Sequence, residues 1–188
     1  MAISFSLAVR LTDAEILELS ERNPGLQIEQ GASGELILTP IGGQASLREV
    51  ALVTQLHRWA DADGSGVVFS PTTGFRLPDG SLLSPDASWV RRDRWEALSV
   101  DQREGFMPSC PDAAFEILSH DDLFHNLRPK MRAYVANGAR LAVLIDPKRR
   151  TVELHTPDRD PQLLESPESV SFDPLLPGFT LDLRRIFE

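Results

Sequence analysis

The sequence predicts an α/β fold (of the α+β kind), in which a mixed β-sheet is flanked by helices and preceded by an N-terminal helix and a β-hairpin. Three observations predict it. Two apolar strands enclose a helix between residues 113 and 145, which is the order of a βαβ unit. Short apolar runs separated by turn residues come before this unit. A long segment of helical periodicity, residues 46–60, contains neither Gly nor Pro.

The N-terminal elements are recognised by their boundaries. Thr12-Asp-Ala-Glu15 has the spacing of a capping box, which predicts the start of a short helix, and Asn23-Pro-Gly ends it. The segments Leu26–Gln30 and Glu35–Pro40 have the composition of strands, and a Gly-containing turn joins them. We therefore expect a β-hairpin after the first helix.

The helical segment 46–60 is expected to be largely buried, because apolar side chains recur along it at helical spacing. These side chains are Leu47, Val50, Val53, Leu56 and Trp59. A region of short strands follows, in which the turn Pro78-Asp-Gly80 joins two of them. The predicted strands are Val67–Phe69, Phe75–Leu77, Leu82–Leu83 and Ala87–Val90. Two short helices are expected within Asp93–Phe106, where Ser99 begins a second capping-box pattern.

The βαβ unit begins with the compact apolar strand Ala113–Leu118. Its helix ends at Gly138, a residue type that commonly terminates helices. Because proline is tolerated in the first turn of a helix, Pro129 indicates a start near Asn126. Leu141–Ile145 is then the second strand, parallel to the first and reached by a right-handed crossover. The remaining predicted strands are Thr151–His155 and one within residues 176–183.

The bulk composition limits the possible classes of protein. A length of 188 residues without repeats or long linkers predicts a single domain over residues 1–188. Cys110 is the only cysteine, which excludes an intramolecular disulfide and a cysteine-rich zinc site. No apolar run approaches the roughly 20 residues that span a bilayer, and the first residues lack the features of a signal peptide. We expect a cytoplasmic location and no membrane partner.

The formal net charge of −9 bears on nucleic-acid binding. Non-specific binding usually relies on a basic surface that releases counterions from the phosphates. The charge therefore disfavours a general DNA-binding protein. It does not exclude a nuclease, because divalent cations can offset local carboxylates. Lysine is scarce: Lys130 and Lys148 are the only two.

Three residues could carry chemistry, and each also has an ordinary structural interpretation. Asp86 follows a proline ahead of a strand, where an aspartate commonly serves a turn. Glu116 interrupts an apolar strand; it could face water, but the βαβ context predicts burial on both faces of the sheet. Lys130 could be a solvated charge on its helix, with Tyr134 one turn later on the same face.

Together these residues would form a plausible metal centre. Two carboxylates held close together repel, and one takes up a proton unless a cation lies between them. A hard cation such as Mg²⁺ or Mn²⁺ prefers oxygen ligands of this kind. Such an ion could polarise a phosphodiester and lower the pKa of a bound water, while a nearby ammonium could stabilise the charge on phosphate.

Five segments, in this order, resemble the putative restriction endonuclease family of the PD-(D/E)xK nuclease superfamily. They are Gly74-Phe-Arg-Leu-Pro-Asp-Gly, Ser84-Pro-Asp-Ala-Ser-Trp-Val, Cys110-Pro-Asp-Ala-Ala-Phe-Glu-Ile-Leu-Ser, Lys130-Met-Arg-Ala-Tyr-Val-Ala-Asn-Gly and Leu144-Ile-Asp-Pro-Lys-Arg-Arg-Thr-Val-Glu. The resemblance runs from about Thr12 to the C-terminus. It implies a restriction-endonuclease-like fold.

The resemblance also implies roles for individual residues. It makes Asp86 and Glu116 ligands of Mg²⁺ or Mn²⁺ and catalytic residues. In the superfamily pattern a lysine stands two residues after the strand acid, but Leu118 occupies that position here. In this family the lysine has moved to the following helix, which points to Lys130 as the third catalytic residue. Family members also carry acids in the first hairpin and near the first long helix. The candidates here are Glu35 and Glu49, which could equally be surface charges.

Two functions of different classes remain open. The first is a Mg²⁺- or Mn²⁺-dependent endonuclease that acts on DNA, and on this hypothesis we expect a homo-oligomer, because such enzymes often pair two active sites. The second is a catalytically silent protein of the same fold that serves as an interaction or regulatory module. A nuclease for RNA or modified DNA is a third possibility. His57, His120 and His125 form no recognisable metal motif, although His120 and His125 lie near the candidate site in sequence and could support it.

Overall fold

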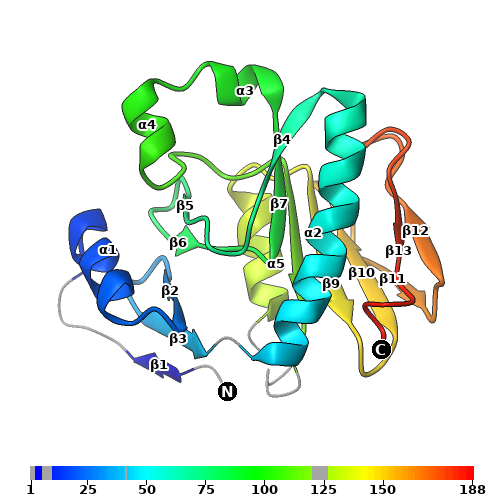
Figure 1. Ribbon diagram of the computed structural model, residues 1–188, viewed down its shortest axis with the longest axis horizontal. Coiled ribbons are helices and arrows are strands. Elements are labelled where there is room, and N and C mark those ends of the chain that lie inside the picture. Colours follow the sequence, from blue (N-terminus) through cyan, green and yellow to red (C-terminus); the bar gives the residue numbers. More distant parts are fainter. Residues whose placement is uncertain (1–2, 6–9, 41, 120–126) are drawn as a thin grey trace.

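The computed structural model describes residues 3–5, 10–40, 42–119 and 127–188. Its centre is a six-stranded sheet in the order β11-β10-β9-β8-β7-β4 (Figure 1). The strands are β4 (Gly66–Phe69), β7 (Ala87–Arg91), β8 (Ala113–Ile117), β9 (Leu141–Asp146), β10 (Thr151–His155) and β11 (Gln162–Glu165). Neighbouring strands are antiparallel except β8 and β9, which pair in parallel, so the predicted βαβ unit is confirmed.

Helices cover both faces of this central sheet. The helix α5 (Leu127–Ala136) connects β8 to β9 and packs on one face. The long helix α2 (Gly43–Asp63) packs on the other face, together with the C-terminal segment. Side chains of β8 alternate between the two faces of the sheet. Phe115 lies in the hydrophobic core between the sheet and α2, whereas Ala114 lies in the core between the sheet and α5. The same alternation places Glu116 on the α5 face.

A second sheet of five strands stands beside the first, in the order β1-β3-β2-β6-β5 (Figure 1). Its strands are β1 (Ile3–Phe5), β2 (Leu26–Gln30), β3 (Leu36–Pro40), β5 (Phe75–Arg76) and β6 (Leu82–Leu83). The predicted hairpin is the β2–β3 pair, and α1 (Asp13–Arg22) packs against it. One residue pair, Gln30 and Leu82, joins the hairpin to β6. The predicted mixed sheet flanked by helices is confirmed, and the predicted hairpin joins β1, β5 and β6 in this second sheet.

The remaining elements lie around the central sheet. They are α3 (Arg92–Glu96), α4 (Val100–Glu104) and a two-stranded sheet of β12 (Ser169–Ser171) and β13 (Thr180–Asp182). The patterns did not predict β1, β11 or β12, which are short strands, the first two of them at sheet edges. None of the helices in the described part of the chain is long and apolar enough to cross a membrane.

Local boundary signals are confirmed. The capping boxes at Thr12 and Ser99 are both formed, each with its side chain accepting the backbone N–H three residues later. Pro129 lies in the first turn of α5, and Gly138 beyond its end has a φ of 107°, a conformation that L side chains rarely adopt. The expected helix start at Asn126 lies outside the described residues.

The expected buried face of α2 is partly wrong. Leu56 is fully buried, but Leu47 and Val50 are 67% and 60% exposed. The physical reason lies in the first half of the helix, where the inward side chains are polar. Arg48 and Glu49 line a cavity there instead of packing into a core. Apolar periodicity therefore indicated the wrong face in this half of α2.

Candidate functional site

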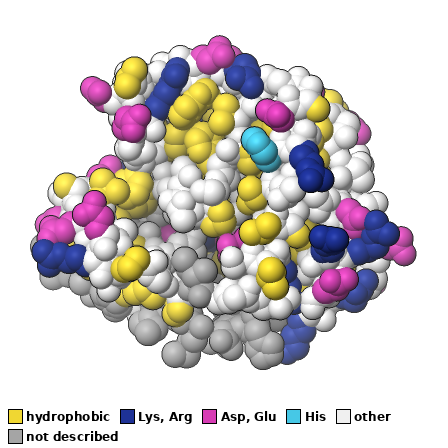
Figure 2. All heavy atoms as spheres, viewed as in Figure 1, with side chains coloured by type: hydrophobic (Ala, Val, Ile, Leu, Met, Phe, Trp, Pro, Cys, Tyr) yellow, Lys and Arg dark blue, Asp and Glu magenta, His cyan; other side chains and the backbone are white. Residues whose placement is uncertain are grey.

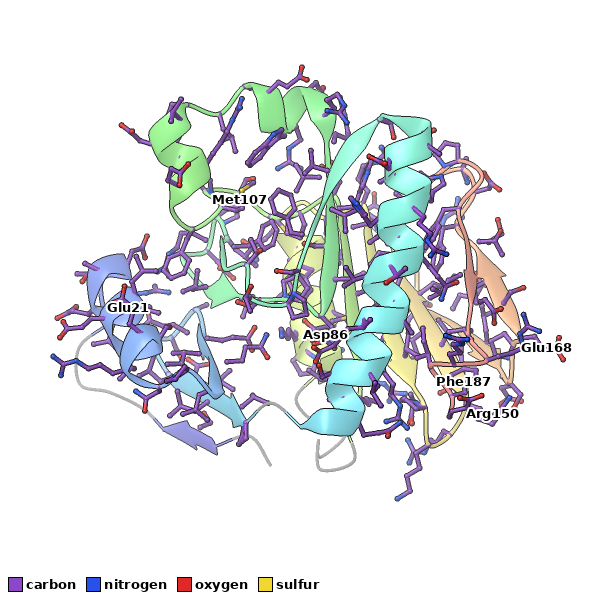
Figure 3. The ribbon with its side chains drawn as sticks, viewed as in Figure 1. Glu21, Asp86, Met107, Arg150, Glu168 and Phe187 are labelled. Carbon is purple, nitrogen blue, oxygen red and sulfur yellow. The ribbon has the colours of Figure 1, made fainter. Side chains whose placement is uncertain are left out.

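A cavity of about 420 Å³ lies between the β2–β3 hairpin, the start of α2, the end of β8 and the first turns of α5. Asp86, Glu116 and Lys130 all line it. Asp86 is labelled in Figure 3, where it lies in the interior beside the first half of α2. The three residues that the sequence selected are thus brought together by segments far apart in the chain.

Asp86 is held by the backbone of the neighbouring strand. It immediately precedes β7, and Ala87 pairs with Phe115 of β8. This register brings the Asp86 carboxylate to the end of β8, where its Oδ2 accepts the N–H of Ile117 at 2.6 Å. The turn interpretation of Asp86 therefore does not describe its environment.

Glu116 is 4% exposed and lies on the face of β8 that α5 covers. Its Oε1 accepts the Tyr134 hydroxyl at 2.9 Å and lies 2.7 Å from Nζ of Lys130. Both partners come from α5, four residues apart, which places them on one side of the helix. The strand glutamate is therefore buried and paired, as the βαβ context indicated.

Lys130 is enclosed by two carboxylates. Its Nζ lies 2.7 Å from Glu116 and 2.8 Å from Oε1 of Glu29, and its side chain is only 11% exposed. The interpretation of Lys130 as a solvated charge is wrong. Leu118 is buried on the same side and lines the same cavity, so Lys130 reaches Glu116 from the helix instead of from the strand.

Burial and mutual repulsion shift the pKa values of the acids. Burial raises the pKa of Asp86 well above its usual range, and the nearby charge of Glu116 raises it further. Burial also raises the pKa of Glu116, to about 7, although Lys130 opposes the shift. Burial alone would lower the pKa of Lys130, but Glu116 and Glu29 outweigh it and the pKa lies above its ordinary value. Lys130 is consequently a permanent cation.

Glu29 is the site residue that the sequence patterns missed. It lies in β2, is 5% exposed, and its Oε1 accepts the N–H of Ser84 at 2.6 Å in addition to the Lys130 contact. The resemblance pointed to an acid of the first hairpin, for which Glu35 was selected. A signal was present, because Glu29 is an acid in an otherwise strand-forming segment.

The other candidates have different positions. Glu35 and Glu49 line the cavity, and burial raises the pKa of Glu49. The hairpin carboxylate that pairs with Lys130 belongs to Glu29 and not to either of these residues. His57 is exposed on α2, whereas His120 and His125 lie outside the described residues.

The residues present fit a hard divalent cation. Within the described ranges, no group of three or more His, Cys, Asp or Glu side chains is arranged to hold an ion by itself. Mg²⁺ is, however, often bound by one or two carboxylates, with water and substrate phosphate as further ligands. Asp86 and Glu116 line the same cavity, and the charge of Glu116 contributes to the raised pKa of Asp86, so these two carboxylates are the ones that could serve as such a pair.

Charges of both signs are mixed on one face of the molecule. On the face shown in Figure 2, Lys and Arg side chains of the described residues stand among Asp and Glu side chains rather than in one continuous basic patch. This distribution agrees with the net charge of −9.

Comparison with known proteins assigns the chain to a family. Residues 13–184 match the family described as putative restriction endonuclease, and the chain belongs to it. Among solved structures, it is similar to a putative nuclease from Anabaena variabilis, with 20% sequence identity and a TM-score of 0.77. The similarity covers 94% of this chain and 97% of that one, and it establishes a common fold. A comparison with curated proteins gave no match.

Proposed function

We propose that this protein is an endonuclease that hydrolyses phosphodiester bonds in DNA, with Asp86 and Glu116 as ligands of Mg²⁺ or Mn²⁺ and Lys130 as the assisting cation. The observation that carries the proposal is the meeting of a buried carboxylate (Glu116), a partly buried carboxylate (Asp86) and the Lys130 ammonium in a single cavity. They come from the start of β7, from β8 and from α5. Membership of the family supports the same activity.

The charge balance of the cluster supports a divalent cation. Two buried carboxylates, those of Glu29 and Glu116, and the partly buried carboxylate of Asp86 accompany the single ammonium of Lys130. When all four groups are ionised, the cluster has an excess of two negative charges. Buried charge is costly unless it is paired. A bound divalent cation would neutralise this excess. Without the cation, carboxylates of the cluster must take up protons instead.

The residues of the chain have separable tasks in this proposal. The ion, when bound, would polarise the phosphodiester and lower the pKa of a water molecule. Asp86 keeps its position through the Ile117 N–H, and Glu116 keeps its position through Tyr134 and Lys130. The Lys130 ammonium would stabilise the negative charge that develops on phosphate as the leaving oxygen departs. Because its pKa is raised, Lys130 donates hydrogen bonds and does not act as the base.

A cleavage assay tests the proposal. Duplex, branched and single-stranded DNA are each incubated with the purified protein in the presence of Mg²⁺, Mn²⁺ or a chelator. We expect cleavage with the ions and none with the chelator. Asp86→Asn should abolish cleavage, whereas Asp182→Asn, an exposed carboxylate on β13, should leave it unchanged. Failure of the wild type to cut any of these substrates would overturn the proposal.

The catalytically silent alternative rests on two observations. The net charge is −9, and Leu118 stands where the superfamily pattern has a lysine. A silent module would not bind DNA even at low salt, and a protein partner would be recovered with it. Electrophoretic mobility shifts at low salt, with Ca²⁺ in place of Mg²⁺, separate the two functions.

The proposal extends to the assembly of the protein. A cut in both strands of a duplex is served by two active sites related by symmetry, so we infer a homo-oligomer. The cytoplasmic location stays a prediction from the sequence. Light scattering during size-exclusion chromatography measures the mass directly. A monomer at the concentration at which duplex DNA is cut would contradict the homo-oligomer.

A further inference from the structure

The ammonium of Lys130 is held from two sides by elements of different sheets. Glu116 belongs to the central sheet, and Glu29 belongs to the β2–β3 hairpin of the N-terminal sheet. We propose that Glu29 is a positioning residue that holds the Lys130 ammonium at the catalytic carboxylates, so that the hairpin is part of the catalytic centre. This inference rests on the proposed function, because it assigns a role within the same site.

Lys130 needs a second anchor for geometric reasons. A lysine ammonium is a point charge on a flexible four-carbon stem, with three N–H donors and no fixed fork. A single acceptor would let Nζ swing around it. Two acceptors from separate elements, 2.7 and 2.8 Å away, hold Nζ between Glu116 and Glu29. The third donor is the one that we assign to the phosphate of the substrate.

Glu29 also connects Lys130 to the segment that carries Asp86. Its Oε1 accepts the N–H of Ser84 at 2.6 Å, two residues before Asp86. The adjacent residue Gln30 pairs with Leu82 of β6, which keeps the hairpin in register with this segment. Oε1 of Glu29 thus contacts both the Lys130 ammonium and the backbone segment that leads to Asp86, the proposed metal ligand.

Stability alone does not explain a carboxylate at this position. Glu116 already neutralises the Lys130 charge within the core. A second buried carboxylate adds a desolvation cost and an excess of negative charge. Glu29 is nevertheless 5% exposed and makes both contacts. Such an arrangement is typical of a functional site in which the position of a cation matters more than the stability of the fold.

The chain offers a matched control on the opposite side of α5. Glu153 of β10 is 9% exposed and forms an ion pair with Arg128 of α5. It therefore also links this helix to a strand through a carboxylate, although its partner Arg128 is 52% exposed. Glu153 does not line the catalytic cavity. If Glu29→Gln acted by loosening α5 as a whole, Glu153→Gln would lower kcat in the same way. If it acts by displacing Lys130, only Glu29→Gln would lower kcat.

The experiment is a double-mutant cycle in the Mn²⁺-dependent cleavage of DNA. Glu29→Gln should lower kcat about 10-fold, less than the roughly 100-fold that a 1 Å misplacement can cost, and should change KM little. Glu29→Gln combined with Lys130→Met should be no slower than Lys130→Met alone, because Glu29 acts through Lys130. Glu153→Gln should retain the wild-type kcat.

Each outcome has one meaning. If the wild type cuts DNA and Glu29→Gln has an unchanged kcat, the positioning role is wrong while the proposed function stands. The same conclusion follows if the effects of Glu29→Gln and Lys130→Met multiply in the double variant. If the wild type does not cut nucleic acid, the proposed function fails and this role fails with it. Circular dichroism and the Tm of each variant show whether it folds. If Glu29→Gln does not fold, Glu29→Asp, which keeps the charge, is measured in its place.

Discussion

The carboxylate of Asp86 accepts the backbone N–H of Ile117, with Oδ2 and N 2.6 Å apart. Ile117 directly follows Glu116 in β8, so this bond joins the two candidate metal ligands through the backbone. This bond fixes the Asp86 carboxylate relative to β8, while Tyr134 and Lys130 of α5 hold the Glu116 carboxylate. Ligands held by such contacts are prepared for an ion before the ion arrives.

Metal binding should stabilise the protein through Asp86. A ligand at about 100 times its Kd adds about 2.7 kcal/mol to the free energy of unfolding, which for a chain of this length is a rise in Tm of roughly 5–10 °C. We expect Mn²⁺ to produce such a rise in the wild type and in Asp182→Asn, but not in Asp86→Asn. Thermal melts with increasing Mn²⁺ measure it. An unmoved wild-type Tm would argue against the metal pair.

The metal-free protein should lose stability as the pH rises from about 4.5 to about 7. Burial raises the pKa of Glu116 from 4.5 to about 7, so in this range the folded state binds more protons than the unfolded state. Stability then falls with rising pH, because the slope follows the difference in bound protons. The raised pKa of Asp86 acts in the same direction. Urea unfolding in the presence of chelator, at several pH values, measures the slope.

The variant Glu116→Gln isolates the contribution of Glu116, because it removes this titrating group while it keeps the size of the side chain. We expect its free energy of unfolding to decline less steeply over the same pH range. An equal slope in the two proteins would show that Glu116 does not carry the raised pKa.

The hydroxyl of Tyr134 should contribute to stability through Glu116. Tyr134 is fully buried and donates to Oε1 of Glu116 at 2.9 Å. Hydrogen bonds to charged groups contribute about 1.5–3 kcal/mol, so Tyr134→Phe should lower the free energy of unfolding by about that amount. Denaturant melts give the value. In a Glu116→Gln background the loss should be smaller, and an undiminished loss would mean that the hydroxyl stabilises the fold through another contact.

Two leucines of α2 should respond differently to truncation. Leu56 is fully buried against the central sheet, whereas Leu47 is 67% exposed. Leu56→Ala should cost about 2–5 kcal/mol, since it leaves a cavity in the core. Leu47→Ala should stay within about 0.5 kcal/mol of the wild type. Similar losses in the two variants, measured by urea unfolding, would contradict the assignment of the inner face of α2.

The sequence indicated most of the local structure, because local structure depends on local chemistry. Capping boxes, turn residues and the placement of Pro129 define helix and strand ends from a few neighbouring residues. The βαβ order determined that Glu116 would lie in a strand covered by a helix. The inner face of α2 was misjudged because Arg48 and Glu49 line a cavity, where polar side chains replace the apolar ones that periodicity detects.

By itself, then, the sequence predicted the fold class and the family, and it selected Asp86, Glu116 and Lys130 as candidate site residues. Only the tertiary structure decided which acid of the hairpin meets Lys130. Glu29 and Glu35 lie on one hairpin six residues apart, and both line the cavity. The choice depends on the pairing of β2 with β6 at Gln30 and Leu82, which brings Glu29 to Ser84. Such a register between distant strands arises from packing in three dimensions, and no local pattern of residues specifies it.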